Sequence, residues 1–248
     1  MKGTEVHFQL WYWWGLEAHE YDTVKILMAL GKVSRSFWDV GAYFGQYSLY
    51  LSKINPSLQI LGFEPNPDVS SKFREQIALN SMNNITISPL AISDKAGKFE
   101  FYNQKNNSSN SSLSLKRKSG AEIIEVDVKP LDDVATDLNV PHLDLVKIDV
   151  EHNELNVLRG MKNIIHQYRP MIVMEVLKTF PNAEAEAILA PEGYAYFYIT
   201  YDGLIKTDKI SRPAEVGNWR LKQRTPYYNF LFCPLEKIAD LKKTCTVL

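Results

Sequence analysis

Short apolar runs alternate with stretches of helical periodicity along most of this chain from residue 36 onward. Five of these runs are rich in β-branched or aromatic residues and are predicted as strands, at 36–40, 59–63, 86–90, 143–148 and 171–176. Helices are predicted between them, over 45–54, 68–82 and 154–165. Strands that alternate with helices are typical of an α/β fold with a mostly parallel sheet.

The pattern changes after the fifth run. A helix is predicted over 182–189, and two aromatic strands follow at 194–200 and 228–232. Because a long loop separates these strands, we expect an antiparallel pair at the end of the sheet. Two more strands, 99–101 and 122–128, flank a polar loop, which predicts a β-hairpin inserted on one edge of the core sheet.

The residues before the first strand are predicted to form an aromatic and helical cap. Residues 21–30 have helical periodicity, and Trp11, Trp13 and Trp14 would wall a substrate pocket, or else pack against the sheet or against a second subunit. A homodimer is therefore an open alternative. We expect one domain, with the cap at 1–35, the core at 36–95 and 140–234, the hairpin insertion and a linker at 96–139, and a tail at 235–248.

Composition narrows the classes of function. The chain has 248 residues, of which 45% are hydrophobic, enough for one sizeable core. Its 28 basic and 29 acidic residues nearly balance, so we expect neither nucleic acid nor a membrane as a partner. Two cysteines and an N-terminus unlike a secretory signal favour the cytoplasm. The last four residues formally match a prenylation motif that begins at Cys245.

The first strand runs into a turn with two glycines, which is typical of a nucleotide-binding site. Gly41 and Gly45 would let the backbone approach a ligand closely, and the helix from Gln46 would direct its amides at that ligand. Glu64 lies 23 residues after Gly41, at the end of the second strand, where Rossmann-like folds place the carboxylate that binds a ribose diol. We expect Gly41→Val or Glu64→Ala to abolish ligand binding and to leave the fold largely intact.

Five motifs in one order resemble those of the FkbM family of S-adenosylmethionine-dependent methyltransferases. They stand here as Asp39 to Gly45, Glu64-Pro65-Asn66-Pro67, Ala91-Ile92-Ser93-Asp94, Leu131-Asp132-Asp133 and Lys147-Ile148-Asp149-Val150-Glu151-His152-Asn153-Glu154. That family usually has Asn where this chain has Tyr43, and Gly where it has His152. The resemblance implies a class I, Rossmann-like methyltransferase fold. It also implies methyl transfer from S-adenosylmethionine to a hydroxyl of a sugar, glycoconjugate or secondary metabolite.

The resemblance implies which residues bind the cofactor. Asp39 would approach the methionine ammonium, and Glu64 the ribose. The other cofactor-binding candidates are Gly41, Ala42, Tyr43, Gly45, Pro65, Asn66, Ala91, Ile92, Ser93 and Asp149, with Ala91 to Ser93 as an adenine wall. Asp149, Glu151 and His152 follow the fourth strand and are the catalytic candidates, for acceptor contacts and proton removal. We expect Glu154 to cap the helix that follows.

Three questions stay open at this point. Asp149, Glu151 and Glu175 would lie near strand ends, and their oxygen atoms suit Mg²⁺, but carboxylates gather there without an ion too, so we expect no metal requirement. The alternatives to a methyltransferase are an NAD(P)-dependent oxidoreductase, which shares the glycine turn and later acid, and a non-catalytic scaffold. The small-molecule or carbohydrate acceptor cannot be identified from these residues.

Overall fold

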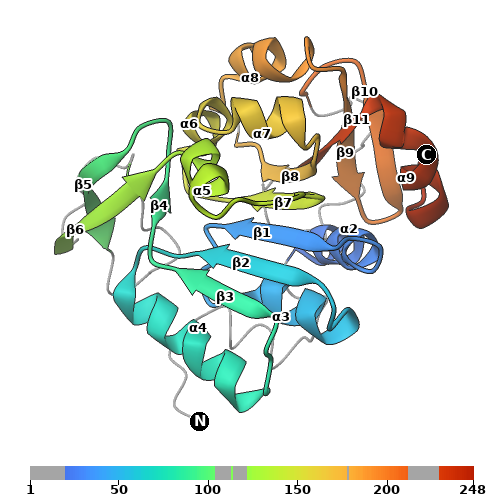
Figure 1. The fold of residues 1–248 in the computed structure, drawn as a ribbon. Coiled ribbons are helices and arrows are strands. Elements are labelled where there is room, and N and C mark those ends of the chain that lie inside the picture. The colour runs from blue at the N-terminus through green and yellow to red at the C-terminus, as the bar shows by residue number, and fades with distance from the viewer. Residues whose placement is uncertain (1–19, 104–112, 114–121, 178, 212–228) are drawn as a thin grey trace.

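The computed structural model describes residues 20–103, 113, 122–177, 179–211 and 229–248 (Figure 1). The predicted aromatic part of the cap, with Trp11, Trp13 and Trp14, lies outside the described residues, as does most of the polar loop of the hairpin. The single-domain division given above stays a prediction.

An eight-stranded sheet forms the centre of the molecule, in the order β10-β9-β11-β8-β7-β1-β2-β3. Its strands are β1 Ser36–Val40, β2 Gln59–Phe63, β3 Ile85–Ser88, β7 Leu145–Ile148, β8 Met171–Glu175, β9 Tyr194–Thr200, β10 Gly203–Thr207 and β11 Asn229–Pro234. Strands β3, β2, β1, β7 and β8 pair in parallel, whereas β11 is antiparallel to both of its neighbours, β8 and β9. The predicted antiparallel ending is therefore confirmed, and a further strand, β10, extends it beyond β9.

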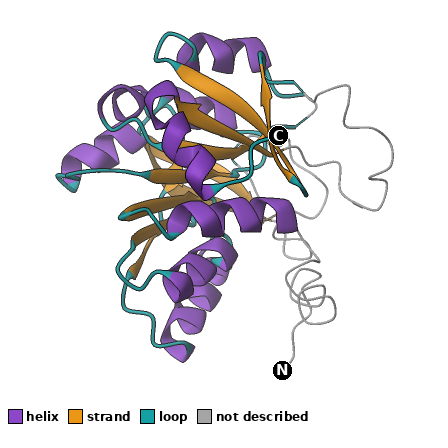
Figure 2. Cartoon of the chain, turned by 90° about the vertical axis from the view of Figure 1, so that its right-hand side faces the viewer, coloured by secondary structure: helices purple, strands orange, loops and turns teal. Residues whose placement is uncertain are grey.

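Helices cover both faces of the central sheet (Figure 2). They are α2 Tyr21–Gly31, α3 Gln46–Ile54, α4 Pro67–Leu79, α5 Leu131–Asp137, α6 Glu154–Arg159, α7 Lys162–Gln167, α8 Asn182–Leu189 and α9 Ile238–Thr244, with a 3₁₀ turn at Leu235–Lys237. Apolar residues of α5 to α8 pack with Val40, Val146 and Met174 on one face. Those of α2, α3 and α9 pack with Phe37 and Leu145 on the other. The central strands are buried on both faces, which explains their continuous apolar runs.

The predicted insertion is a separate sheet rather than an addition to one edge of the core sheet. Strands β5 (Gly97–Asn103) and β6 (Glu122–Lys129) form the expected antiparallel hairpin. Strand β4 (Ala91–Ile92) pairs with β6 in parallel, which gives a three-stranded sheet in the order β4-β6-β5. Figure 1 shows this sheet beyond the arrowheads of β2 and β3, so it lies at the carboxyl edge of the central sheet.

The helix predicted over 154–165 is two helices, α6 and α7, that meet at Gly160 and Met161. A Cβ on Gly160 would lie 2.2 Å from the carbonyl oxygen of Ser93, so a residue with a side chain would collide with the backbone there. The Asp132 side chain then accepts hydrogen bonds from the N–H groups of Asn163 and Ile164 at the start of α7. The Leu-Asp-Asp motif therefore caps a helix.

The end of the chain pairs with β10. The N–H of Leu204 donates to the carbonyl of Thr246, and the N–H of Leu248 donates back to the carbonyl of Leu204. Cys245, the first residue of the prenylation-like motif, is 7% exposed and packs into the apolar core beside α2 and α9. Its thiol is therefore covered in the folded chain. None of the described helices is long and apolar enough to cross a bilayer.

Candidate functional site

The glycine turn follows β1 at the carboxyl edge of the sheet. The N–H groups of Gly41 and Ala42 both donate to the carbonyl of Phe63 at the end of β2, so the turn is fixed to the neighbouring strand. Gly41, Tyr43 and Gly45 have φ angles of 78°, 51° and 77°, all in the left-handed region. Asparagine adopts this region more readily than tyrosine does, which gives a physical reason for the asparagine that the resemblance led us to expect at position 43.

Other parts of the protein pack directly against Gly41 and Gly45, so neither position has space for a side chain. A Cβ on Gly41 would lie 1.8 Å from the backbone oxygen of Asp149, and one on Gly45 would lie 1.8 Å from the ring of Phe73. Both substitutions would also strain a left-handed backbone. The expectation that Gly41→Val leaves the fold largely intact conflicts with this close packing.

Glu64 organises the same turn from the end of β2. Its Oε2 accepts from the N–H of Tyr43 at 2.9 Å, and its Oε1 accepts from the N–H of Asn66 at 2.8 Å. Burial raises the pKa of Glu64 to about 7, against the opposing effect of these two hydrogen bonds. Each carboxylate oxygen can accept a further hydrogen bond, so the geometry can receive two donors such as a ribose diol.

Asn66 and Pro65 complete that motif. Asn66 is the N-cap of α4, where its Oδ1 accepts from the N–H groups of Asp68 and Val69. It therefore shapes the turn through its own N–H and side chain, and Pro65 lies half-buried between it and Glu64.

Asp39 is fully buried at the end of β1. Its Oδ2 accepts from the hydroxyl of Ser48 at 2.7 Å, but its Oδ1 has no hydrogen-bond partner among the residues that the structure describes. Burial raises the pKa of Asp39, while the charge of Lys147 lowers it. A buried carboxylate oxygen without a partner is costly, and a cationic ligand would satisfy it.

Lys147 is a buried cation beside Asp39 and Asp149, and it was not among the predicted site residues. Asp39 and Lys147 are register partners on adjacent strands, and alternation puts both side chains on the face that α2 and α3 cover. The Lys147 Nζ donates to Asp149 Oδ2 at 2.8 Å, and the lysine side chain is 2% exposed. Burial opposes this charge, but the carboxylates around it, Asp149 first, hold the pKa of Lys147 above its usual value. A lysine inside the apolar run of β7 is the sequence signal that could have revealed it.

The structure gives less support to the predicted adenine wall, which consists of Ala91, Ile92 and Ser93. Ala91 packs with Phe101 in the core of the small sheet, and Ile92 belongs to the main core. The carbonyl of Ile92 accepts from the side chain of Asn153 at 2.9 Å, which ties β4 to the loop after β7. The side chains of Ala91 and Ile92 are buried and offer almost no surface to a ligand. The adenine wall therefore stays a prediction, with little support from these two residues.

The loop after β7 carries the predicted catalytic residues in a strained backbone. Glu151 and His152 have φ angles of 53° and 75°. Glycine is the residue that adopts this conformation without strain, so His152 holds a glycine-like backbone despite its Cβ. Glu154 is buried, and its Oε1 accepts from the N–H groups of Val150 and His152 at 3.3 and 3.1 Å. Glu154 lies in the first turn of α6, as expected, but these two hydrogen bonds hold the loop before the helix rather than cap the helix itself.

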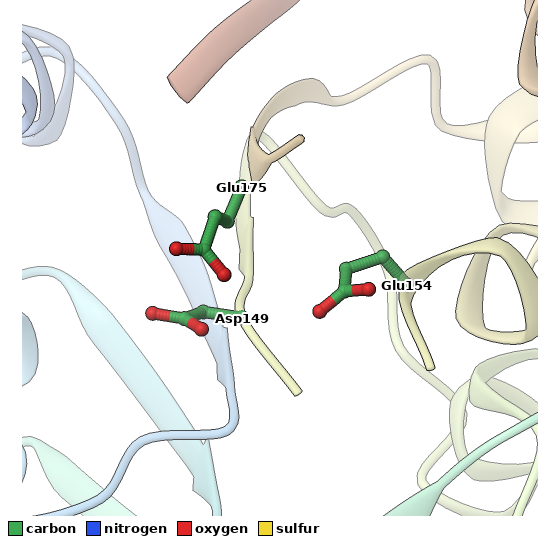
Figure 3. A group of neighbouring side chains, drawn as sticks. All are labelled: Asp149, Glu154 and Glu175. Carbon is green, nitrogen blue, oxygen red and sulfur yellow. The ribbon is translucent and has the colours of Figure 1, made fainter. Parts of the chain in front are cut away.

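Three carboxyl groups converge at this edge (Figure 3). Asp149, Glu154 and Glu175 each have an oxygen within 4.8 Å of the others, and this is the group of possible metal ligands among the described residues. This group shares Asp149 and Glu175 with the possible metal ligands named from the sequence, and it has Glu154 where Glu151 was named. Glu151 is not a member of this group, although its charge is one of those that raise the pKa of Glu175. Figure 3 shows the Glu154 carboxylate pointing toward Asp149.

The negative charge of these three carboxyl groups is already compensated by other groups of the protein. Lys147 donates to Asp149, and two backbone N–H groups donate to Glu154. Burial, and next the charge of Asp149, raise the pKa of Glu175 to about 10, so Glu175 is protonated at neutral pH. Oxygen ligands at this spacing would suit a hard divalent cation, but a lysine and a retained proton already balance the acids.

Glu175→Gln should stabilise the protein at neutral pH, with an advantage that grows as pH rises. The folded state keeps the Glu175 proton up to about pH 10, whereas the unfolded chain releases it near 4.5, so wild-type stability falls across that window. Glutamine removes this dependence, and the difference in unfolding free energy should widen by roughly 1 kcal/mol per pH unit. Thermal and urea unfolding at several pH values measure it. Glu75→Gln on the exposed side of α4 is the matched control, and a pH-independent difference for Glu175→Gln would contradict the assignment.

Comparison with known proteins places this geometry in a family. The chain is similar to the hexuronic acid methyltransferase AglP of Haloferax volcanii, at 28% identity over 163 residues, which are 62% of this chain and 61% of that protein. It is also similar to the 2-O-methyltransferase NoeI of Sinorhizobium fredii, at 23% identity over 58% of this chain and 65% of that one. The chain thus spans less than two thirds of the length of either relative.

A solved structure shares the fold. The FkbM methyltransferase of Methylobacillus flagellatus superposes with a TM-score of 0.52 and 15% identity, over 80% of this chain and 43% of that one. The central sheet, with its reversed strand β11, is the class I Rossmann-like methyltransferase arrangement predicted above. The sequence model of the methyltransferase FkbM domain matches residues 39–197, more than half of the chain. The chain therefore belongs to the FkbM methyltransferase family.

Proposed function

We propose that this protein transfers a methyl group from S-adenosylmethionine to a hydroxyl oxygen of a sugar, glycoconjugate or secondary metabolite. The observation that carries the donor assignment is the pair of buried carboxylates at the ends of β1 and β2. Asp39 presents an oxygen that no described residue satisfies, and Glu64 presents two oxygens with remaining acceptor capacity. A ligand with an ammonium group and a vicinal diol satisfies both, and S-adenosylmethionine has these groups.

The charge of the site also suits S-adenosylmethionine. Asp39, Asp149, Glu154 and Glu175 gather at one edge of the sheet, near the buried ammonium of Lys147. When bound, S-adenosylmethionine supplies a methyl group on a positively charged sulfur. The acids of this edge would hold that cationic end, while Glu64 would fix the ribose and so set the direction of the methyl group. Alignment of this kind can lower a barrier by about 7–11 kcal/mol.

The acceptor class rests on the relatives. Two of them are named for a hexuronic acid and for 2-O-methylation. We infer a hydroxyl acceptor of the carbohydrate type, which reaches the donor from the side of the loop after β7. Asp149, Glu151 and His152 remain the candidates that take the acceptor proton. His152 lies one residue before Asn153, whose side chain anchors this loop to β4.

The function is tested first by calorimetry with S-adenosylmethionine, S-adenosylhomocysteine and NAD⁺, each in the presence of Mg²⁺ and of EDTA. We expect both sulfur compounds to bind, NAD⁺ not to bind, and chelation to change nothing, because Lys147 and a retained proton already balance the carboxylate cluster. Binding of NAD⁺ alone would favour an oxidoreductase, and binding of none would favour a scaffold. Loss of affinity in EDTA would show a metal requirement.

The acceptor is tested with methyl-labelled S-adenosylmethionine and a panel of hexuronic acids, neutral sugars and their glycosides. We expect label in an ether linkage on a sugar hydroxyl. On the acceptor found, His152→Gly removes the imidazole without adding backbone strain, and Asp149→Asn removes a carboxylate without changing its size. The variant that loses turnover and keeps donor affinity identifies the group that takes the proton.

A further inference from the structure

Lys147 is the one buried ammonium described at an edge that otherwise gathers acids. Its Nζ lies 2.8 Å from Asp149 Oδ2 and 4.7 Å from the centroid of the Tyr47 ring. Tyr47, on α3, donates its hydroxyl to a carboxylate oxygen of Glu20, the residue that precedes α2. Four residues thus form one connected group: Glu20 before α2, Tyr47 in α3, Lys147 in β7 and Asp149 just after β7.

We propose that Lys147 is a positioning residue of the donor site, which holds the Asp149 carboxylate in place and couples it to helix α2 through Tyr47 and Glu20. This inference rests on the proposed function, since it assigns Lys147 to the site that would bind S-adenosylmethionine. Nothing in the family comparison assigns a role to Glu20, Tyr47 or Lys147.

The backbone and the side chain of Asp149 are held by different groups. Its N–H donates to the carbonyl of Val40, and its carbonyl packs against Gly41, so the main chain is fixed to the end of β1. Its carboxylate has one hydrogen bond to the described residues, from Lys147. Without that ammonium, repulsion from Asp39 and the other acids would turn the carboxylate away from its present direction.

Lys147 is in turn held from the side of α2. The Tyr47 ring presents its face to the ammonium, which is a favourable cation–π arrangement in a buried site. Burial raises the pKa of Tyr47 well above its usual value, so its hydroxyl stays a donor to Glu20. Glu20 has a left-handed backbone, with a φ angle of 49°. Its side chain accepts a hydrogen bond from Tyr47 and makes no capping hydrogen bond to helix α2. Docking of α2 and the direction of Asp149 are therefore linked.

Lys147→Met keeps the length of the side chain and removes its charge. We expect this variant to bind S-adenosylhomocysteine about tenfold or more weakly, since one partner of a buried ion pair is lost. Affinity for S-adenosylmethionine should fall less, because its extra positive charge gains from the removal of the lysine. Lys147→Arg should recover most of the affinity, since a guanidinium can pair with a carboxylate and stack on a ring. Lys243→Met, on the exposed part of α9, should match the wild type.

The link to α2 is tested by a double-mutant cycle. Glu20→Gln alone should weaken binding of S-adenosylhomocysteine, but adding it to Lys147→Met should change affinity by no more than about twofold, because both act through one group. Additive losses would overturn the coupling. Wild-type affinity for both ligands in folded Lys147→Met, or equal losses for both ligands without recovery in Lys147→Arg, would overturn the positioning role.

Two safeguards separate the possible failures. If Lys147→Met does not fold, Tyr47→Phe carries the test, because it removes the hydroxyl that donates to Glu20. Wild-type affinity for S-adenosylhomocysteine in folded Tyr47→Phe would overturn the proposal. If the wild-type protein binds neither sulfur compound, the proposed function itself fails. If the wild type binds both and the variants match it, only the present inference fails.

Discussion

Gly41→Ala is expected to prevent stable folding, although it adds a single carbon atom. That Cβ would lie 1.8 Å from the backbone oxygen of Asp149, and the φ angle of 78° is one that alanine adopts only with strain. Relief requires β1 and β7 to move apart at their carboxyl ends, where the core is closely packed. The cost should reach about 4 kcal/mol or more, a large part of the stability of a typical domain. Soluble yield and thermal unfolding measure the effect.

Gly62→Ala is the matched control for this experiment. Gly62 lies in β2, beside β1, and its added Cβ would come no closer than 3.1 Å to the Phe73 ring, without a positive φ angle. We expect a folded protein with a small loss of stability. Equal stability of the two variants would contradict the close approach at Gly41.

Glu64→Ala should abolish measurable donor binding and leave a folded protein. The change removes two acceptors for the ribose and also leaves the N–H groups of Tyr43 and Asn66 unpaired in the turn. Each hydrogen bond to a charged group contributes about 1.5–3 kcal/mol, so affinity for S-adenosylhomocysteine should fall by at least about 100-fold. Calorimetry measures the loss, and Glu75→Ala on the exposed side of α4 is the control.

The wild-type protein offers a second readout of Glu64. Burial raises its pKa to about 7, and only the ionised form accepts from two hydroxyl groups. Affinity for S-adenosylhomocysteine should therefore fall as pH decreases below about 7. In Glu64→Gln the affinity should be low and independent of pH across this range. A pH-dependent affinity that survives in Glu64→Gln would place the titrating group elsewhere.

The sequence predicts most of the central sheet because its strands are buried on both faces. The boundaries of β1 and β2 are confirmed to the residue, since each apolar run ends at a charged or glycine-rich turn. Strand β10 was not expected, because Gly203–Thr207 has only two apolar residues and its outer neighbour is the end of the chain. The pairing of β4 with β6 also depends on contacts between distant segments, which periodicity does not carry.

The sequence predicted the main acidic residues of the candidate site, but it did not predict which charged groups lie next to one another there. Motif positions placed Asp39, Glu64 and Asp149 at one edge of the sheet, and the structure brings these residues there. The expected metal set took Glu151 in place of Glu154, because spacing along the chain does not reveal two consecutive left-handed residues. Lys147 was quoted as part of the fifth motif but was given no role, although a lysine between Val146 and Ile148 must find a partner when buried.

Strand β11 has a consequence for the order in which this chain can fold during synthesis. Residues 229–234 leave the ribosome after all the other described strands of the central sheet, yet they join β8 to β9. Until they arrive, β9 and β10 form a hairpin with no hydrogen-bonded neighbour in the sheet, and the apolar edge of β8 is open. A nascent chain that stops before residue 229 should therefore expose two aggregation-prone edges, and one that continues to residue 234 should close both in a single step.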